Sequence, residues 1–264
     1  MKRINWNKLW QILFLIVFVW IIFSSIFNST IDFQFNPIVV FSLSFAIVVL
    51  LSLLYRKLNL CTKEISDKKC YIFLIIVMFI MIVIQTIIGF YVRTDPTWDL
   101  GIVIRGANQI VSNGHLTSDA GYFLWNNNNV GTLLIVTIFY KLFNFLHLPL
   151  GNCAGLCLNI IFIQLAIFLM FKVAKKLYGN LSACVVVVLA ALFIPFYTYA
   201  PIYYSDTLSM FVPLLIFYLY LRSCDMNENN KKCVIYVLIG IVCFLGIKIK
   251  VTAIIIGIAI IGNV

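Results

Sequence analysis

The chain has 264 residues, of which 63% are hydrophobic and only 11% are charged. A soluble domain is about half apolar and about a quarter charged, because polar side chains must cover its surface. The composition therefore excludes a water-soluble globule and predicts an all-α, polytopic bundle of transmembrane helices. The formal net charge of +10 would suggest nucleic acid in a soluble protein. In a membrane protein, the distribution of positive charge over the loops first indicates the orientation of the spans. We therefore expect no nucleic-acid partner.

Apolar runs long enough to cross a bilayer, which takes about 20 residues, recur along the chain. Seven runs qualify: 9–27, 37–55, 71–92, 152–171, 181–199, 207–221 and 233–247. Two more are less regular, since 129–146 carries Lys141 and 251–264 is short. We predict about seven or eight spans in a single membrane domain, with 1–70 as an N-terminal helical hairpin and 71–264 as the core.

The positive charges predict the orientation, because lysine and arginine gather in cytoplasmic loops. Three basic residues precede the first span and five lie in the loop 56–70, so the N-terminus is cytoplasmic and 93–128 lies outside. If 129–146 crosses the membrane, 11 basic residues are inside and 8 outside. If it lies along the outer surface or re-enters, the counts become 14 and 5. The second topology fits better and predicts a multi-pass protein of the cell membrane.

This topology places five aspartates at the outer face, beside or within apolar segments for the most part. They are Asp32, Asp95, Asp99, Asp119 and Asp206. Asp206 is the most informative, because a carboxylate at the mouth of a span is costly and usually functional. The alternative is a helix N-cap formed by Ser205 or Asp206.

The outer loop also carries an amphipathic pattern. Apolar residues in 98–113 are spaced for a short helix on the membrane surface, with Asp99 and Arg105 on its polar face. The aromatic residues Tyr122 and Trp125 are either part of a membrane-interface belt or part of a binding site.

Two lysines lie at an outer boundary, against the positive-inside trend. Lys248 and Lys250 either snorkel towards water or anchor a phosphate. Charges of both signs on three segments of one face predict a cleft that handles an anionic lipid headgroup. His115 and His147 have no neighbouring His or Cys in the sequence, so we expect no histidine-based metal site.

Short motifs follow an outer aspartate, which is Asp95 or Asp99. They are YF (122–123) with NNVG (128–131), YSDT (204–207) and KVTA (250–253). In these motifs, over about residues 70–264, the chain resembles the GT-C superfamily of glycosyltransferases. It is most similar to the family 39-like group of protein mannosyltransferases and aminoarabinose transferases, although Asn127 and Val251 stand where that group has proline.

The resemblance implies inverting transfer of a sugar from a polyprenyl-phosphate donor to a glycan, lipid or protein acceptor at the outer face of a bacterial membrane. Asp99, or else Asp95, would be the general base that takes the proton of the acceptor hydroxyl. Lys250, with Lys248 or Arg105, would bind the phosphate of the lipid leaving group.

The resemblance also implies that Asp206 orients the acceptor or tunes the cleft. The other implied substrate-binding residues, with the two aromatic rings of the loop stacking on sugar, are Tyr122, Trp125, Asn128, Asn129 and Tyr204. No cofactor is expected. A divalent metal shared by Asp99 and Asp206 is the less favoured alternative, because lysines can already neutralise the phosphate.

Two other functions remain open. One is a non-enzymatic membrane protein, either a carrier of lipid-linked sugar or a subunit of an assembly. Carriers typically show inverted repeats and broken helices at mid-membrane, and no internal repeat is evident in the sequence. The other is an inactive remnant, since the relatives continue with further spans and this chain resembles their N-terminal part.

Overall fold

The structure is a computed structural model that describes residues 12, 15–17, 19–24, 37–61, 65–92, 96–149 and 151–261. Every regular element in these ranges is a helix, which confirms the all-α prediction. The chain divides into two compact units, Met1–Lys63 and Glu64–Val264.

In the first unit the structure describes helix α2 (Pro37–Cys61), which contains the predicted span 37–55. Its described apolar side chains, such as Ile38 and Phe45, are largely exposed, as lipid-facing residues would be. Of the predicted span 9–27, the structure describes residues 12, 15–17 and 19–24, and these are helical.

The second unit contains the remaining helices. In chain order they are α3 (Asp67–Tyr91), α4 (Trp98–Asn113), α5 (Ala120–Trp125), η1 (Asn127–Asn129), α6 (Val130–Phe145), α7 (Asn152–Leu192), α8 (Pro195–Thr198), α9 (Ser205–Ser209), α10 (Phe211–Cys224), α11 (Asn229–Ile249), η2 (Val251–Ile254) and α12 (Ile255–Ile261).

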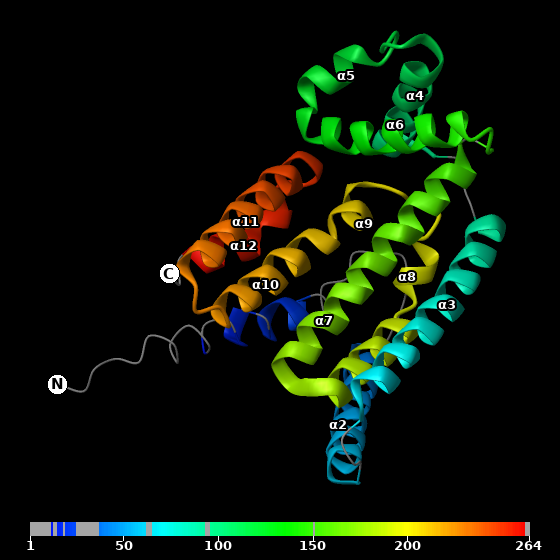
Figure 1. Ribbon diagram of the computed structural model, residues 1–264. Helices are drawn as coiled ribbons and strands as arrows, with labels where there is room; N and C mark the ends of the chain where they lie inside the picture. Colours follow the sequence, from blue (N-terminus) through cyan, green and yellow to red (C-terminus); the bar gives the residue numbers. More distant parts are fainter. Residues whose placement is uncertain are drawn as a thin grey trace. The chain divides into compact units, whose positions relative to one another are not determined.

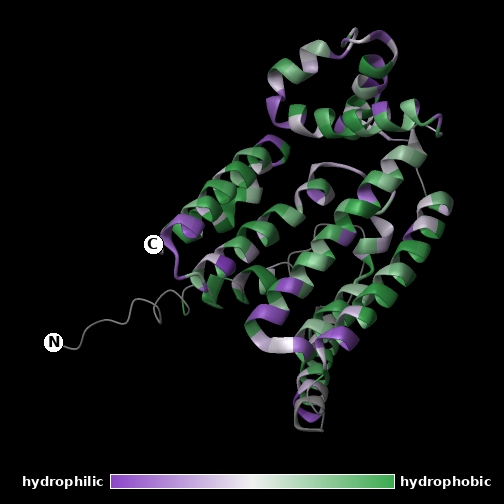
Figure 2. Ribbon diagram, in the orientation of Figure 1, coloured by the Kyte–Doolittle hydropathy of each residue, from purple (hydrophilic) through white to green (hydrophobic). Residues whose placement is uncertain are grey.

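Four stretches of the described residues are long and apolar enough to cross a membrane. They are Asp67–Tyr91, Cys153–Leu192, Ser205–Cys224 and Asn229–Ile249. Figure 2 shows that these helices are mostly hydrophobic, while hydrophilic residues lie towards the helix ends and at the turn in the middle of Cys153–Leu192. The protein is therefore a helical membrane protein. The described part of the chain has four such stretches, so the prediction of seven or eight spans is not confirmed.

Part of this difference comes from α7, which joins two predicted spans. The helix continues from Asn152 to Leu192, but Gly179 has φ 84° and ψ −174°, a backbone conformation that breaks the helical path. Figure 1 shows the chain turning back at this point. The predicted runs 152–171 and 181–199 are thus two legs of one element.

The second leg of α7 ends earlier than the predicted span 181–199. After Leu192 the chain forms the short helix α8 and an irregular stretch up to Tyr204. Irregular backbone inside a membrane protein needs internal hydrogen-bond partners, because lipid offers none.

Two polar side chains from other helix segments supply those partners. The Gln85 Nε2 donates to the carbonyl of Phe196 at 2.8 Å. The Asn159 Nδ2 lies 2.7, 2.9 and 3.2 Å from three carbonyl oxygens in the range 199–202. Both side chains are fully buried. They hold the irregular stretch that leads into α9.

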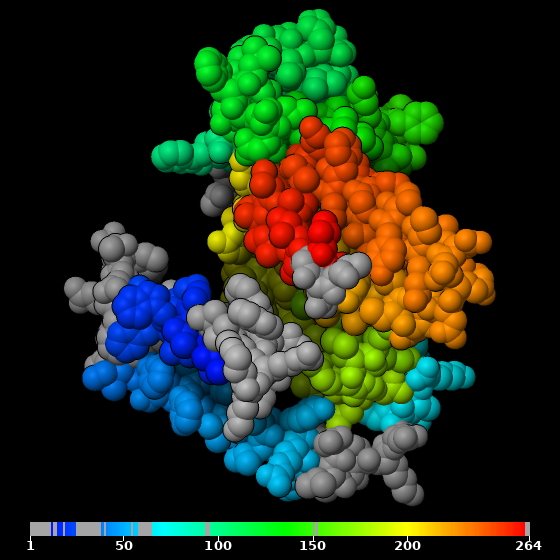
Figure 3. All heavy atoms as spheres, turned by 90° about the vertical axis from the view of Figure 1, so that its left-hand side faces the viewer, coloured from blue at the N-terminus to red at the C-terminus, as the bar shows by residue number. Residues whose placement is uncertain are grey.

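Helices α4, α5, η1 and α6 form a top layer, residues 98–145, across one end of the α3, α7, α10 and α11 bundle (Figure 1). We call this the upper end. Helix α6 runs crosswise to α7, and its buried Leu133 and Val136 belong to one core with Val103 and Ala107 of α4. Figure 3 shows α11 and α12 side by side beneath this layer.

A buried pair of tyrosines joins the top layer to the bundle. The hydroxyl groups of Tyr140 in α6 and Tyr203 lie 2.9 Å apart. Gly155 of α7 leaves room for Tyr203, since a Cβ at this position would lie 2.1 Å from the ring. The top layer therefore lies directly on the residues that precede α9.

The lower end, around Gly179 and the α10–α11 turn, is held by ion pairs. The Lys175 ammonium lies 2.9 Å from the Asp67 carboxylate, and Lys176 pairs with Asp225. Asp67 and Asp225 thus neutralise part of the positive charge of the lysines in α7.

Candidate functional site

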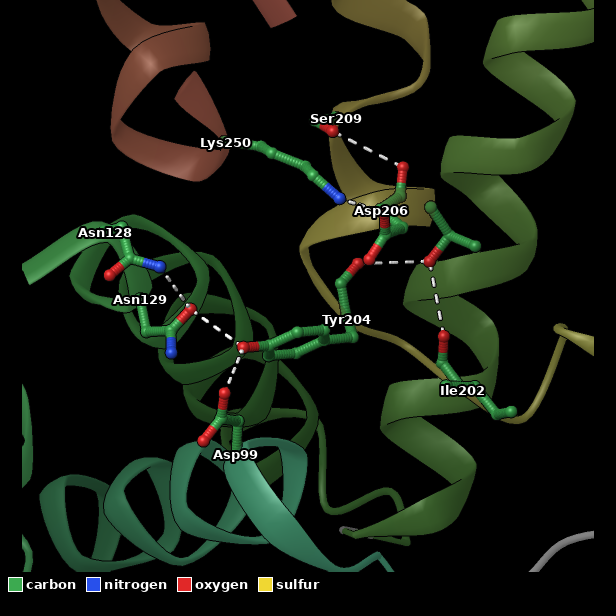
Figure 4. Close-up of polar contacts among 9 residues, drawn as sticks. Asp99, Asn128, Asn129, Ile202, Tyr204, Asp206, Ser209 and Lys250 are labelled. Atoms are coloured by element: carbon green, nitrogen blue, oxygen red, sulfur yellow. Dashed lines mark hydrogen bonds and ion pairs between the residues drawn. The ribbon is translucent and has the colours of Figure 1, made fainter. Parts of the chain in front are cut away.

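Polar side chains from four separate segments meet at the upper end (Figure 4). Asp99 comes from the first turn of α4, Asn129 from η1, Tyr204 and Asp206 from the start of α9, and Lys250 from the end of α11. Asp99 and Lys250 are 151 positions apart in the sequence, so only the fold brings these side chains together.

The start of α4 presents Asp99 to this cluster. Gly101 allows the preceding chain to approach the helix, because a Cβ there would lie 2.6 Å from the Pro96 carbonyl oxygen. Trp98 has φ 55°, a strained conformation for a residue other than glycine. An acidic residue in the first turn is also stabilised by the helix dipole. The Tyr204 hydroxyl donates to the Asp99 Oδ2 at 3.2 Å.

Asn129 connects the loop to the cluster. Its side chain is buried, and its Nδ2 donates to the Tyr122 hydroxyl at 2.6 Å. Its Oδ1 accepts from the Tyr204 hydroxyl at 3.0 Å and from the Asn128 Nδ2 at 3.3 Å. Both the nitrogen and the oxygen of the Asn129 amide are therefore hydrogen-bonded. Through these bonds Asn129 fixes the relative position of Tyr122 and Tyr204.

The two tyrosines act as protonated donors. Burial raises the pKa of Tyr122 well above its ordinary value of 10.0, and the neighbouring Asp99 carboxylate adds to the shift. Burial and the same carboxylate raise the pKa of Tyr204, with a further contribution from Asp206. A phenol has one proton to donate, so Tyr204 shares it between Asp99 and Asn129.

Asp206 pairs with Lys250 across the space between α9 and α11 (Figure 4). The Asp206 side chain is 63% exposed and that of Lys250 is 33% exposed. Pairs of this exposure contribute only about 0–1 kcal/mol, so a charged ligand can compete for either group. The N-cap of α9 is Tyr204, without a side-chain cap bond. The alternative interpretation of Ser205 or Asp206 as an N-cap is therefore wrong.

Asp206 also borders a cavity of about 440 Å³, which is within the usual range for a small-ligand site. Its wall includes the aromatic side chains Phe193, Phe196 and Tyr199. A carboxylate at the edge of an aromatic wall can bind hydroxyl groups while the rings contact an apolar face of the ligand.

Arg105 pairs with a carboxylate of the top layer, and its phosphate-binding role stays a prediction. Its guanidinium lies 3.5 Å from the Asp119 carboxylate, and Gln109 donates to Asp119 at 3.1 Å and to Ser118 at 2.7 Å. These contacts close the loop between α4 and α5. The structure thus gives Arg105 a partner within the top layer, away from the Tyr204 network.

The other residues implied by the resemblance are Lys248, Trp125 and Asp95. Lys248 is exposed, and its ammonium lies 5.6 Å from the ring of Phe244 on its own helix. Trp125 is 91% exposed. Asp95 and Asp32 lie outside the described residues. The structure brings together Asp99, Asp206, Lys250, Tyr122, Tyr204, Asn128 and Asn129.

Asn159 is a positioning residue that no sequence motif singled out. It holds the carbonyls just before Tyr204, as described above. Its position inside the apolar run 152–171 could have indicated such a role, because a polar side chain within a span needs a hydrogen-bond partner. Tyr203 gave no comparable signal, since its partner Tyr140 is 63 residues away.

No group of three or more His, Cys, Asp or Glu side chains in the described part of the chain is placed to hold a metal ion. Asp206 is paired with Lys250, and the Tyr204 hydroxyl contacts Asp99. The site of the described residues is therefore a set of carboxylates, phenols, amides and one ammonium.

Comparison of the chain with models of protein families, with curated proteins and with solved structures found no match. The resemblance to the GT-C glycosyltransferases stays a prediction that depends on the motifs quoted above.

Proposed function

We propose that the protein is a membrane glycosyltransferase that moves a sugar from a polyprenyl-phosphate donor to an acceptor hydroxyl at the outer face of the cell membrane. One observation carries the proposal. Asp99, oriented by Tyr204, lies at the same end of an apolar bundle as the pair of Asp206 and Lys250. A base, a cation and an apolar support are what this reaction requires.

The distribution of charge supports an outer location for the upper end. The lower end and its adjoining helix turns carry Lys172, Lys175, Lys176, Arg222, Lys231 and Lys232. Basic residues favour the cytoplasmic side, so the top layer would face outwards and the N-terminus would be cytoplasmic. The crosswise direction of α6 (Figure 1) suits a helix that lies along the membrane surface.

The chemistry follows from the residues at the upper end. The acceptor oxygen attacks the anomeric carbon, and the bond from that carbon to the phosphate oxygen breaks. Asp99 takes the acceptor proton, while the bonding electrons leave with the lipid phosphate. A single displacement of this kind inverts the anomeric configuration. Tyr204 orients the Asp99 carboxylate and keeps its own proton, since its pKa is raised.

Lys250 would stabilise the leaving phosphate. Its ammonium is paired with Asp206. When the donor phosphate binds, the ammonium exchanges one anionic partner for another, which stabilises charge as it develops on the leaving oxygen. Asp206 is then free to accept hydrogen bonds from sugar hydroxyls in the adjoining cavity.

An apolar groove between α3 and α7 would accommodate an isoprenoid chain. Its volume is about 650 Å³, and its wall includes Ile82, Phe90, Leu156, Ile161 and Phe168. Phe143 of α6 also lines it, so the groove reaches the top layer. A long apolar chain gains about 0.8 kcal/mol for each buried CH₂ group.

The test measures transfer of radiolabelled hexose or pentose from synthetic polyprenyl phosphates in membranes that contain the full chain. Asp99→Asn should reduce transfer by about 10²–10⁴-fold, because it removes the base. Asp206→Asn should also reduce it. Asp67→Asn, which changes a carboxylate at the lower end, is the matched control and should leave transfer unchanged.

Two results would count against the proposal. Full transfer by the Asp99→Asn variant would refute the assignment of the base. A wild-type chain that releases no polyprenyl phosphate from any sugar donor would refute the transferase function and favour a carrier or an assembly subunit.

A further inference from the structure

A second groove lies at the lower end, between the last turn of α10 and the first turns of α11. Asp206 lies before α10 and Lys250 follows α11, at the opposite ends of these two helices. Its volume is about 470 Å³. It lies where the last turn of α10 meets the first turns of α11, which is the level at which a span passes from hydrocarbon into the headgroup region. The proposed sugar transfer does not use this groove.

The charged side chains that line the groove are two basic residues and one acidic residue, Glu228, so its net charge is positive. Arg222, in the last turn of α10, and Lys231, in the first turn of α11, both line it. Among the described residues no carboxylate lies within ion-pair distance of Arg222. Lys231 lies 2.8 Å from Glu228, but both side chains are mostly exposed, so this pair is weak and readily shared. Arg222 is therefore available to an anion.

The wall below the mouth is apolar. Leu219 faces the groove from α10, and Val234, Ile235 and Leu238 face it from α11. Val234 is 60% exposed and Leu238 is 43% exposed, so the groove is open along the outer surface of the bundle. A soluble anion would leave this wall uncovered, whereas an acyl chain would cover it.

We propose that this groove binds one anionic glycerophospholipid of the adjoining leaflet. The phosphate would accept hydrogen bonds from the Arg222 guanidinium, which is suited to two-pronged contact with phosphate oxygens, and from Lys231. One acyl chain would lie along Leu219, Val234 and Leu238. Basic pockets between membrane helices on the cytoplasmic side bind lipid headgroups in this manner.

The experiment measures thermal unfolding of the purified full chain in a neutral detergent. Phosphatidylglycerol, phosphatidylcholine or glycerol phosphate is titrated into separate samples. A ligand that binds only the folded state raises the unfolding midpoint as its concentration increases. We expect phosphatidylglycerol to raise the midpoint, phosphatidylcholine to do so at higher concentrations only, and glycerol phosphate to have no effect.

Two pairs of variants locate the effect. Arg222→Gln should weaken the apparent affinity for phosphatidylglycerol about five-fold, the size expected for one basic residue at a membrane surface. Lys232→Gln removes a charge just outside the groove and should change it much less. Val234→Trp should fill the groove and abolish the response, whereas Val237→Trp, at a similarly exposed position outside the groove, should preserve it.

Each contrary outcome has a definite meaning. Equal stabilisation by phosphatidylcholine would show that the headgroup is not recognised. Stabilisation by glycerol phosphate alone would indicate a free phosphate site. Equal effects of the two charge variants, or of the two tryptophan variants, would show that binding is spread over the surface. Any of these would overturn the proposal, and none depends on whether sugar transfer is observed.

Discussion

Replacing Gly131 by alanine tests how closely the top layer must lie on the bundle. Gly131 is in the first turn of α6, and a Cβ at this position would lie 1.9 Å from the Lys248 carbonyl oxygen and 2.3 Å from the carbonyl carbon. Both atoms belong to the backbone, so no side chain can rotate away. The two helices would have to separate by about 1.5 Å, because overfilled contacts relax only by such shifts.

The cost has two parts. Overpacking of this kind destabilises a protein by about 1–3 kcal/mol. Asn129 lies two residues before Gly131, and its Oδ1 is 3.0 Å from the Tyr204 hydroxyl. A shift of about 1.5 Å would break that bond, which is worth about 1 kcal/mol. We therefore expect Gly131→Ala to destabilise the fold by about 2–4 kcal/mol, and to reduce sugar transfer about 10²-fold through misplacement of the site.

Thermal unfolding of the purified protein, followed by circular dichroism, measures the effect on stability. The unfolding midpoint of Gly131→Ala should fall by about 5–10 °C. Gly121→Ala is the matched control, because Gly121 is exposed in α5 and a Cβ there would meet no atom within 4 Å. If both variants unfold at the wild-type temperature, the close contact between α6 and α11 does not exist in the protein.

Two further predictions concern tyrosine hydroxyl groups. Tyr140→Phe leaves the buried Tyr203 hydroxyl without its partner, so denaturant unfolding should show a loss of about 1–3 kcal/mol, and the double phenylalanine variant should lose less than the sum of the single variants. Burial, together with Asp99, raises the pKa of Tyr122, so the folded state binds the phenolic proton more tightly than the unfolded state. Stability from this group is fully present below its ordinary pKa of 10.0 and decreases as the pH rises above it. Unfolding midpoints between about pH 9 and 11 should therefore fall less steeply for Tyr122→Phe than for wild type, whereas Tyr91→Phe, at an exposed position, should retain the wild-type slope.

The apolar runs predicted the helices well where the helix depends only on local sequence. The runs 71–92, 207–221 and 233–247 fall within or close to α3, α9–α10 and α11. A helix satisfies its own backbone hydrogen bonds, so a continuous apolar run is enough to specify it in lipid. The run 181–199 predicted too long a helix, because its last residues form an irregular stretch that is held by Gln85 and Asn159. These two contacts join residues far apart in the chain, so no local sequence pattern contains them.

By itself the sequence determined the class of the protein, since 11% charged residues cannot coat a soluble surface. It also singled out Asp99, Asp206 and Lys250, because a charge at the end of an apolar run is conspicuous. Which charges form pairs was decided only by the tertiary structure. Arg105 closes a loop with Asp119, while Lys250 pairs with Asp206. Arg105 meets Asp119 only because the chain folds back after α4, and Lys250 meets Asp206 only because the end of α11 lies beside α9.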